Sequence, residues 1–176
     1  MARKRDRAFA LFGAILFLLT SVGVSVGVIW QMSQGSNKDN KTTQQEANML
    51  AGTKLQGFTP NGDITELKIE DLTPGTGKEV KAGDTVTVDY TGAVAATGII
   101  FQSSKDSGQP VSFPLDGVIA GWTEGMPGMK EGGTRRLLIP AEKAYGANPP
   151  QGSGIPANAA LVFDVTLHSV GASKEQ

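Results

Sequence analysis

The chain has 176 residues and a formal net charge of -1, and 39% of the residues are hydrophobic. This length is enough for one ordinary domain and a further segment. The chain contains no cysteine, which excludes thiol catalysis, cysteine-ligated metal sites, disulfides and a lipid-modified cysteine anchor. The first 30 residues carry a net charge of +3, so the remainder carries -4, which argues against nucleic acid as a partner.

An uncharged apolar run occupies residues 8–30 and follows four basic side chains. As a helix it would extend about 34 Å, enough to cross a hydrocarbon core of about 30 Å. The preceding basic residues predict that residues 1–30 are a single-pass anchor with a cytoplasmic N-terminus and an exported remainder. The alternative is a cleaved signal peptide and secretion, although the run is long for a signal and lacks a clear cleavage site.

Residues 31–62 are rich in polar side chains, and residues 33–45 contain no aromatic side chain. Such a composition cannot bury enough apolar surface to offset the entropy lost on ordering. We therefore expect residues 31–62 to form a flexible linker. A folded domain is predicted over residues 63–172, followed by a short tail at 173–176.

Alternating apolar and polar residues predict strands in the folded domain over residues 66–70, 85–90, 134–139 and 160–170. Two shorter strands are expected at 99–101 and 110–113. Residues 118–126 are the one substantial helix expected there, because Val118, Ile119, Trp122 and Met126 recur at helical spacing. Short connections require mostly antiparallel pairing. The predicted fold class is α+β, with a twisted antiparallel β-sheet wrapped around one short α-helix.

The six aromatic residues beyond position 65 each belong to a different predicted element. Aromatic side chains usually dominate cores, so a plain packed core is one interpretation. The alternative is a concave apolar binding site with a few polar groups, because Tyr90 and Tyr145 bring hydroxyls and Tyr145 adjoins a loop rich in Gly and Pro. The six residues are Tyr90, Phe101, Phe113, Trp122, Tyr145 and Phe163.

Five short motifs occur in order along the predicted domain: VDYTG at 88–92, FQSS at 101–104, VIAGW at 118–122, AYG at 144–146 and LVFDV at 161–165. In order and in spacing they resemble the signatures of FKBP-type peptidyl-prolyl cis-trans isomerases over about residues 66–171. The resemblance implies the FKBP-like fold and an enzyme that binds X-Pro segments without a cofactor, a metal or a covalent step.

The resemblance also implies a proline-binding pocket with Trp122 beneath the proline ring. Ligands of the family accept hydrogen bonds from the backbone N–H at the position of Ile119 and from the hydroxyl at the position of Tyr145. The implied catalytic residues are Tyr90, Phe101, Trp122, Tyr145 and Phe163. The implied substrate-binding residues are Gln102, Val111, Phe113, Val118, Ile119 and Ile155.

Three positions depart from the family pattern. Gln102 stands where many members carry Asp, Ser107 where an Arg often pairs with that Asp, and Val111 where an aromatic residue is common. Macrolides are therefore expected as weaker ligands, beside proline-containing polypeptide clients, and the domain is expected to be monomeric. A low-turnover module or chaperone that binds proline segments remains the alternative to an enzyme.

Other charged and polar residues offer little further chemistry. His168 is the one histidine, and without cysteine or a second histidine it predicts no transition-metal site. We expect it on the surface of the last strand. The adjacent Arg135 and Arg136 are expected on a solvated strand face.

Overall fold

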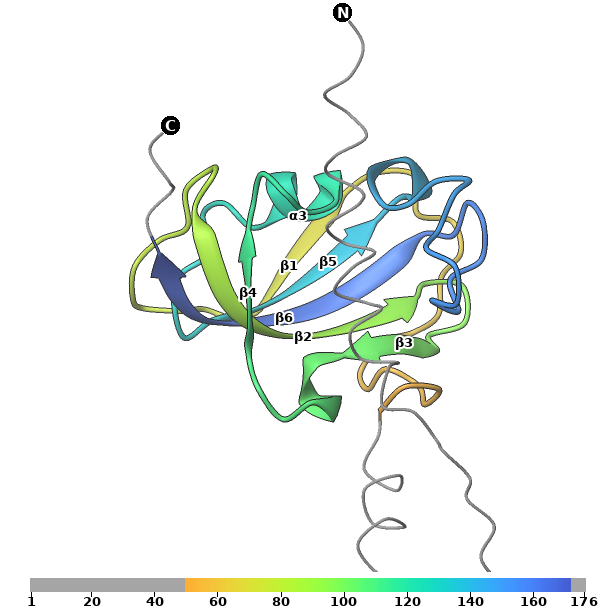
Figure 1. Cartoon of the computed structure of the whole chain (residues 1–176), viewed down its shortest axis with the longest axis horizontal. Coiled ribbons are helices and arrows are strands. Elements are labelled where there is room, and N and C mark those ends of the chain that lie inside the picture. Colours follow the sequence, from red (N-terminus) through yellow and green to blue (C-terminus); the bar gives the residue numbers. More distant parts are fainter. Residues whose placement is uncertain (1–49, 172–176) are drawn as a thin grey trace, which may run out of the picture. The chain divides into compact units, whose positions relative to one another are not determined.

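The computed structural model describes residues 50–171, which form one antiparallel sheet with a short helix against it (Figure 1). The strand order is β1-β5-β6-β2-β3, and β4 pairs with the first half of β2. The predicted α+β fold of an antiparallel sheet and one short helix is confirmed for this part of the chain. The strands are β1 Lys68–Thr73, β2 Thr85–Val94, β3 Ile100–Ser103, β4 Val111–Pro114, β5 Thr134–Ile139 and β6 Leu161–Gly171. The helices are α3 Ala120–Gly125 and the 3-10 turns η1 Ser104–Asp106 and η2 Ala141–Lys143.

The two longest strands, β2 and β6, form the centre of the sheet. They pair along almost their full lengths, from Thr85 opposite Gly171 to Val94 opposite Leu161. The alternation in β2 places Val86 and Val88 on one face with no exposed surface. Those two valines and Tyr90 point to the face that α3 covers, which we name the inner face. The opposite side of the sheet is the outer face.

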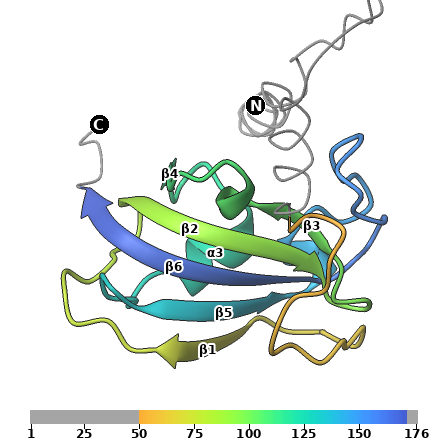
Figure 2. The same ribbon diagram turned by 90° about the horizontal axis from the view of Figure 1, so that it is seen from below.

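Helix α3 lies against the inner face of the sheet (Figure 2). Two of its glycines face β5 and allow this close approach. A Cβ atom built on Gly125 would come within 2.8 Å of Leu137 Cδ2, and one built on Gly121 would overlap Ile139. Glycine at both positions, one helical turn apart, lets the backbone of α3 approach the strand. This approach positions Trp122, which lies between the two glycines in sequence.

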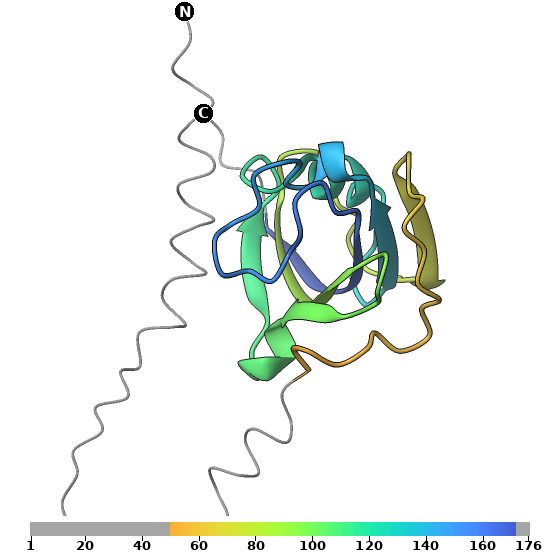
Figure 3. The same ribbon diagram turned by 90° about the vertical axis from the view of Figure 1, so that its right-hand side faces the viewer.

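The outer face carries a segment that the sequence pattern assigned to the linker as far as residue 62. Residues 50–64, which we name the strap, follow the edge of β3 and then cross the sheet towards β1 (Figure 3). Leu55 and Ile64 of the strap are buried in a second small apolar core. The predicted linker thus differs from the structure over residues 50–62, because a few well-spaced apolar residues anchor an otherwise polar stretch.

Strand β1 also differs from expectation. Its residues are all exposed, including Ile69 and Leu72, whereas a half-buried strand was predicted near this position. The reason is its place at the sheet edge, where it pairs with β5 alone. Within residues 50–171 no helix is long and apolar enough to cross a membrane. The predicted anchor at 8–30, linker residues 31–49 and the tail at 173–176 lie outside the described residues.

Candidate functional site

Trp122 is the centre of a ring cluster on the inner face. Its indole lies 5.8 Å from the ring of Tyr90, 5.7 Å from Phe113 and 5.5 Å from Phe163, measured between centroids. The interplanar angles are 85°, 81° and 90°, so all three contacts are edge-to-face, an arrangement that aromatic quadrupoles favour. A residue from α3 therefore meets rings from β2, β4 and β6.

The cluster extends to β3 through Phe101, whose ring lies 5.7 Å from that of Phe163. Gly92 on β2 makes this contact sterically feasible. A Cβ atom at that position would lie 2.6 Å from Phe163 Cε1 and 2.7 Å from Phe101 Cζ. The glycine that ends the VDYTG motif is therefore required by the two rings beside it.

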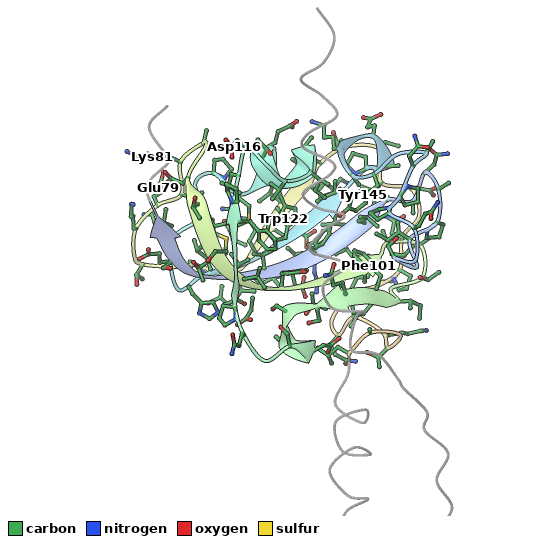
Figure 4. All side chains as sticks on the ribbon, viewed as in Figure 1. Glu79, Lys81, Phe101, Asp116, Trp122 and Tyr145 are labelled. Carbon is green, nitrogen blue, oxygen red and sulfur yellow. The ribbon has the colours of Figure 1, made fainter. Side chains whose placement is uncertain are left out.

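The predicted site residues divide into a buried set and a half-buried set. The structure buries Tyr90, Phe113, Ile119, Trp122, Ile155 and Phe163. It leaves Phe101, Gln102, Val111, Val118 and Tyr145 half-buried. In the view of Figure 4, Trp122 lies between Glu79, Lys81 and Asp116 on one side and Phe101 and Tyr145 on the other. The cavity predicted above the indole stays a prediction.

Both tyrosine hydroxyls at this site hold their protons strongly. Burial raises the pKa of Tyr90 to about 12. Burial, together with the nearby Tyr90, also raises the pKa of Tyr145 to about 12. At neutral pH both groups are therefore neutral phenols that can donate a hydrogen bond.

Polar groups on the other side of β2 fix the backbone of Tyr90. The amide of Tyr90 donates to Ser104 Oγ at 3.0 Å, and that hydroxyl donates to Asp89 Oδ1 at 2.9 Å. His168 Nε2 lies 2.7 Å from Asp89 Oδ2. Burial acts to raise the pKa of Asp89, but the hydrogen bonds from His168 and Ser104 outweigh it and the pKa is lowered. Within residues 50–171 no group of three His, Cys, Asp or Glu side chains is placed to hold a metal ion.

The arginine pair on β5 is buried, which contradicts the predicted solvated face. Arg135 binds Asp71 through Nε at 2.6 Å and donates to the carbonyl of Gly125, at the end of α3, at 2.8 Å. Arg136 forms a two-point ion pair with Asp164, at 2.6 and 2.8 Å. The sequence carried one signal for this burial, because the two arginines stand in an otherwise apolar strand. A buried charge requires partners, and the carboxylates and carbonyls found here are those partners.

Residues 76–168 match the family of FKBP-type peptidyl-prolyl cis-trans isomerases. A probable FK506-binding protein of Corynebacterium glutamicum is 50% identical over 118 residues, which span 66% of this chain and 98% of that protein. The FKBP-type isomerase FkpA of Escherichia coli K12 is 48% identical over 107 residues, or 60% of this chain and 38% of FkpA. The aligned sequence thus spans well under half of FkpA but nearly all of the Corynebacterium protein.

The fold comparison agrees with the sequence comparison. The crystal structure of Escherichia coli FkpA matches with a TM-score of 0.57 and 40% sequence identity. The match covers 75% of this chain and 58% of the FkpA chain. The structure of AtFKBP13 matches with a TM-score of 0.53 and 33% identity, covering 58% of this chain and 91% of that one.

Proposed function

This chain belongs to the FKBP-type peptidyl-prolyl cis-trans isomerases, and we propose that the ring cluster around Trp122 is where it binds and rotates the X-Pro bond. The observation that carries this assignment is the convergence of three rings on one indole. The rings are apolar and contact one another edge-to-face, and a proline ring is compact, apolar and fixed in φ.

The energetic demand on such a site is modest. Rotation of a peptide bond has a barrier of about 18–20 kcal/mol, and uncatalysed X-Pro exchange takes tens of seconds or more. A rate increase of about four decades requires roughly 5.5 kcal/mol of transition-state stabilisation. Positioned contacts can supply this amount without a covalent intermediate.

The ring cluster favours the twisted amide over the planar one. Water stabilises the charge separation of the planar amide, and the twisted amide has lost that resonance, so transfer to apolar surroundings favours the twisted form. The Tyr145 hydroxyl and the backbone N–H of Ile119 are the proposed donors to the bound segment. Each hydrogen bond would add about 1 kcal/mol. The raised pKa of Tyr145 keeps its proton available for this role.

Substitution of Trp122 tests the site assignment. In a prolyl-peptide isomerisation assay on the full-length protein, Trp122→Leu is expected to lower kcat/KM by about tenfold or more, since one tenfold step corresponds to about 1.4 kcal/mol. The matched control is Trp30→Leu at the other tryptophan of the chain, which is expected to retain full activity. Equal activity in the two variants would reject Trp122 as a site residue.

Macrolides of the FK506 type are proposed as further ligands of the same site. Two relatives of this chain are named as FK506-binding proteins, at 50% and 49% identity. Gln102 and Val111 are half-buried, and the family pattern has other residues at both positions. We therefore expect this chain to bind FK506 more weakly than family members that keep the pattern. Calorimetry with FK506 on the wild type and on the Gln102→Asp variant would measure the difference.

Tethering to a membrane is a separate proposal. Residues 8–30 are proposed as a signal anchor that keeps the isomerase domain on the extracytoplasmic side, as a monomer, where it would act on proline-containing segments of exported proteins. The support is the uncharged apolar run behind four basic residues. Mass spectrometry of the N-terminus of the mature protein tests it. A mature chain without residues 1–30 would instead favour secretion after cleavage.

A further inference from the structure

The strap pairs with the backbone of β3 directly before the part of that strand that enters the ring cluster. Gly52 N–H donates to the carbonyl of Ile100 at 2.7 Å, and Ile100 N–H donates to the carbonyl of Thr53 at 2.8 Å. Leu55 N–H donates to the carbonyl of Gly98 at 2.8 Å. The strap therefore acts as an additional strand on the edge of β3, and it covers an otherwise open edge.

A bulge in β3 directs Phe101 into the cluster. Gly92 of β2 pairs with Gln102, and the next residue of β2, Ala93, pairs with Ile100, so Phe101 has no partner in the ladder. An extra residue of this kind bends the strand and redirects a side chain. Ile100 is buried against the strap on the outer face, while the ring of Phe101 meets Phe163 on the inner face.

Asp106 connects the strap to the chain on the other side of this bulge. Its carboxylate accepts from the backbone N–H of Leu50 at 2.7 Å and of Ala51 at 3.3 Å. Hydrogen bonds of this type to an ionised carboxylate are stronger than neutral ones. The strap thus contacts β3 at Ile100, before Phe101, and the following turn η1 at Asp106, after it.

A second anchor lies where the strap crosses β5 and β6. Arg136 donates to the carbonyl of Gly57 at 2.6 Å and to that of Gln56 at 3.2 Å, and its guanidinium lies 5.5 Å from the ring centre of Phe58. Its partner Asp164 directly follows Phe163 in β6. Both rings of the Phe101–Phe163 contact therefore belong to strands that the strap holds from the outer face.

Between the anchors Leu55 is buried against the sheet, but the packing of the strap is not continuous. A cavity of about 300 Å³ lies there, bounded partly by Leu50, Leu55 and Gln56 of the strap and by Asp89, Thr91 and Thr166 of the sheet. Near η1 the strap is held by the two hydrogen bonds to Asp106 and by Leu50, which is half-buried against the outer apolar core.

We propose that the strap is a positioning element of the isomerase site and that Asp106 is its positioning residue for Phe101. Asp106 lies outside the ring cluster and acts through the backbone of the β3 bulge. Without it, the strap end at Leu50 loses its hydrogen bonds to η1, the bulge loses that contact on one side, and the Phe101 ring samples positions away from Phe163. This inference rests on the proposed function, because it assumes that Phe101 contacts the substrate.

The test is a double-mutant cycle on the full-length protein in the prolyl-peptide assay. Asp106→Ala is expected to lower kcat/KM about tenfold, and Asp106→Asn, which keeps one acceptor oxygen, to recover part of that loss. In a Phe101→Ala background the same Asp106→Ala change is expected to alter kcat/KM by less than about twofold. The matched control is Asp63→Ala, at an exposed aspartate of the strap. Assays are run where urea unfolding shows each variant to be fully folded.

Each outcome supports or overturns the proposal. An equal loss for Asp106→Ala in both backgrounds would show a general structural effect and overturn it, as would an Asp106→Ala protein with full activity. If the Asp106→Ala variant does not fold, the same cycle is measured with Asp106→Asn. The same comparison of backgrounds then decides the proposal, with a smaller expected loss of kcat/KM. If Phe101→Ala alone leaves kcat/KM unchanged, the site assignment under the proposed function has failed, which is a different result from failure of the strap.

Discussion

The ring cluster and the arginine pair of β5 are both buried, but they are held by different forces. The rings around Trp122 meet edge-to-face and present apolar surface on the inner face. Arg135 and Arg136 instead form directed bonds to carboxylates and backbone carbonyls. Under the proposed function the rings contact the ligand, whereas the arginine contacts fix the positions of β1, α3 and the strap. We therefore expect substitutions in the rings to change activity first and substitutions of the arginines to change stability first.

The largest effect is expected for Arg135→Met. This change removes the guanidinium that binds Asp71 and the carbonyl of Gly125, and it leaves those acceptors without their charged donor. Water can solvate the half-exposed Asp71, but each buried carbonyl left without a donor costs about 1–3 kcal/mol, and Arg135 donates to the carbonyls of Gly125 and Pro127. Urea unfolding measures the loss, with Lys130→Met as the exposed control. A loss below about 1 kcal/mol would contradict the structural role of Arg135.

The next effect is expected for Gly92→Ala. The added methyl group would overlap the rings of Phe163 and Phe101, so both must move. Overpacking of this kind costs about 1–3 kcal/mol of stability. Because both displaced rings belong to the cluster, kcat/KM is expected to fall at least about tenfold at a temperature where the variant is folded.

Gly171→Ala is the control for that substitution. A Cβ atom there would make contacts of 3.5 Å and 3.7 Å with Thr85, which are ordinary van der Waals distances. Unchanged activity is expected for this variant. If Gly92→Ala also kept full activity, the two rings would not belong to the site.

A smaller effect is expected for Tyr145→Phe. This variant keeps the ring and loses one proposed hydrogen-bond donor, which corresponds to about 1 kcal/mol and a fall in kcat/KM of about fivefold. The assay is the same isomerisation measurement, with Ser169→Ala as an exposed hydroxyl control on β6. A variant as active as the wild type would remove the hydroxyl from the proposed mechanism.

The smallest effect is expected for a change of pH. Because both tyrosines stay protonated, kcat/KM should stay constant between about pH 7 and 10. The chain contains two tyrosines, Tyr90 and Tyr145, so phenolate absorbance reports on them alone. In the folded protein they should titrate near 12 and in the unfolded protein near 10. Since the folded pKa values are raised, their contribution to stability is complete below pH 10 and is lost as pH rises through about 12. A native titration near 10 would contradict the burial of these hydroxyls.

Much of the fold could be predicted because periodicity and motifs are local properties. The alternation of β2 and β6 and the apolar stripe with Trp122 identified the central strands and α3. The strap was missed because its buried apolar residues, Leu55 and Ile64, are separated by polar residues. Their apolar partners lie on strands that are distant in the sequence.

The ring cluster that forms the candidate site could be predicted in part for the same reason. The resemblance identified residues that the structure brings together in one cluster, with Trp122 at its centre. The burial of Arg135 and Arg136 could not be predicted from their own neighbours, since their carboxylates lie 64 and 28 residues away. The role of Asp106 depends in the same way on backbone groups 55 and 56 residues distant.

Fluorescence of Trp122 during peptide binding tests the central claim most directly. In a Trp30→Phe protein, Trp122 is the remaining tryptophan, so its emission reports on the ring cluster alone. We predict a saturable emission change with an Ala-Pro peptide, with a midpoint near the KM of the same peptide, and no change with the matched Ala-Ala peptide. An active protein whose Trp122 emission is unaffected by the Ala-Pro peptide would contradict the assignment of the proline site to this cluster.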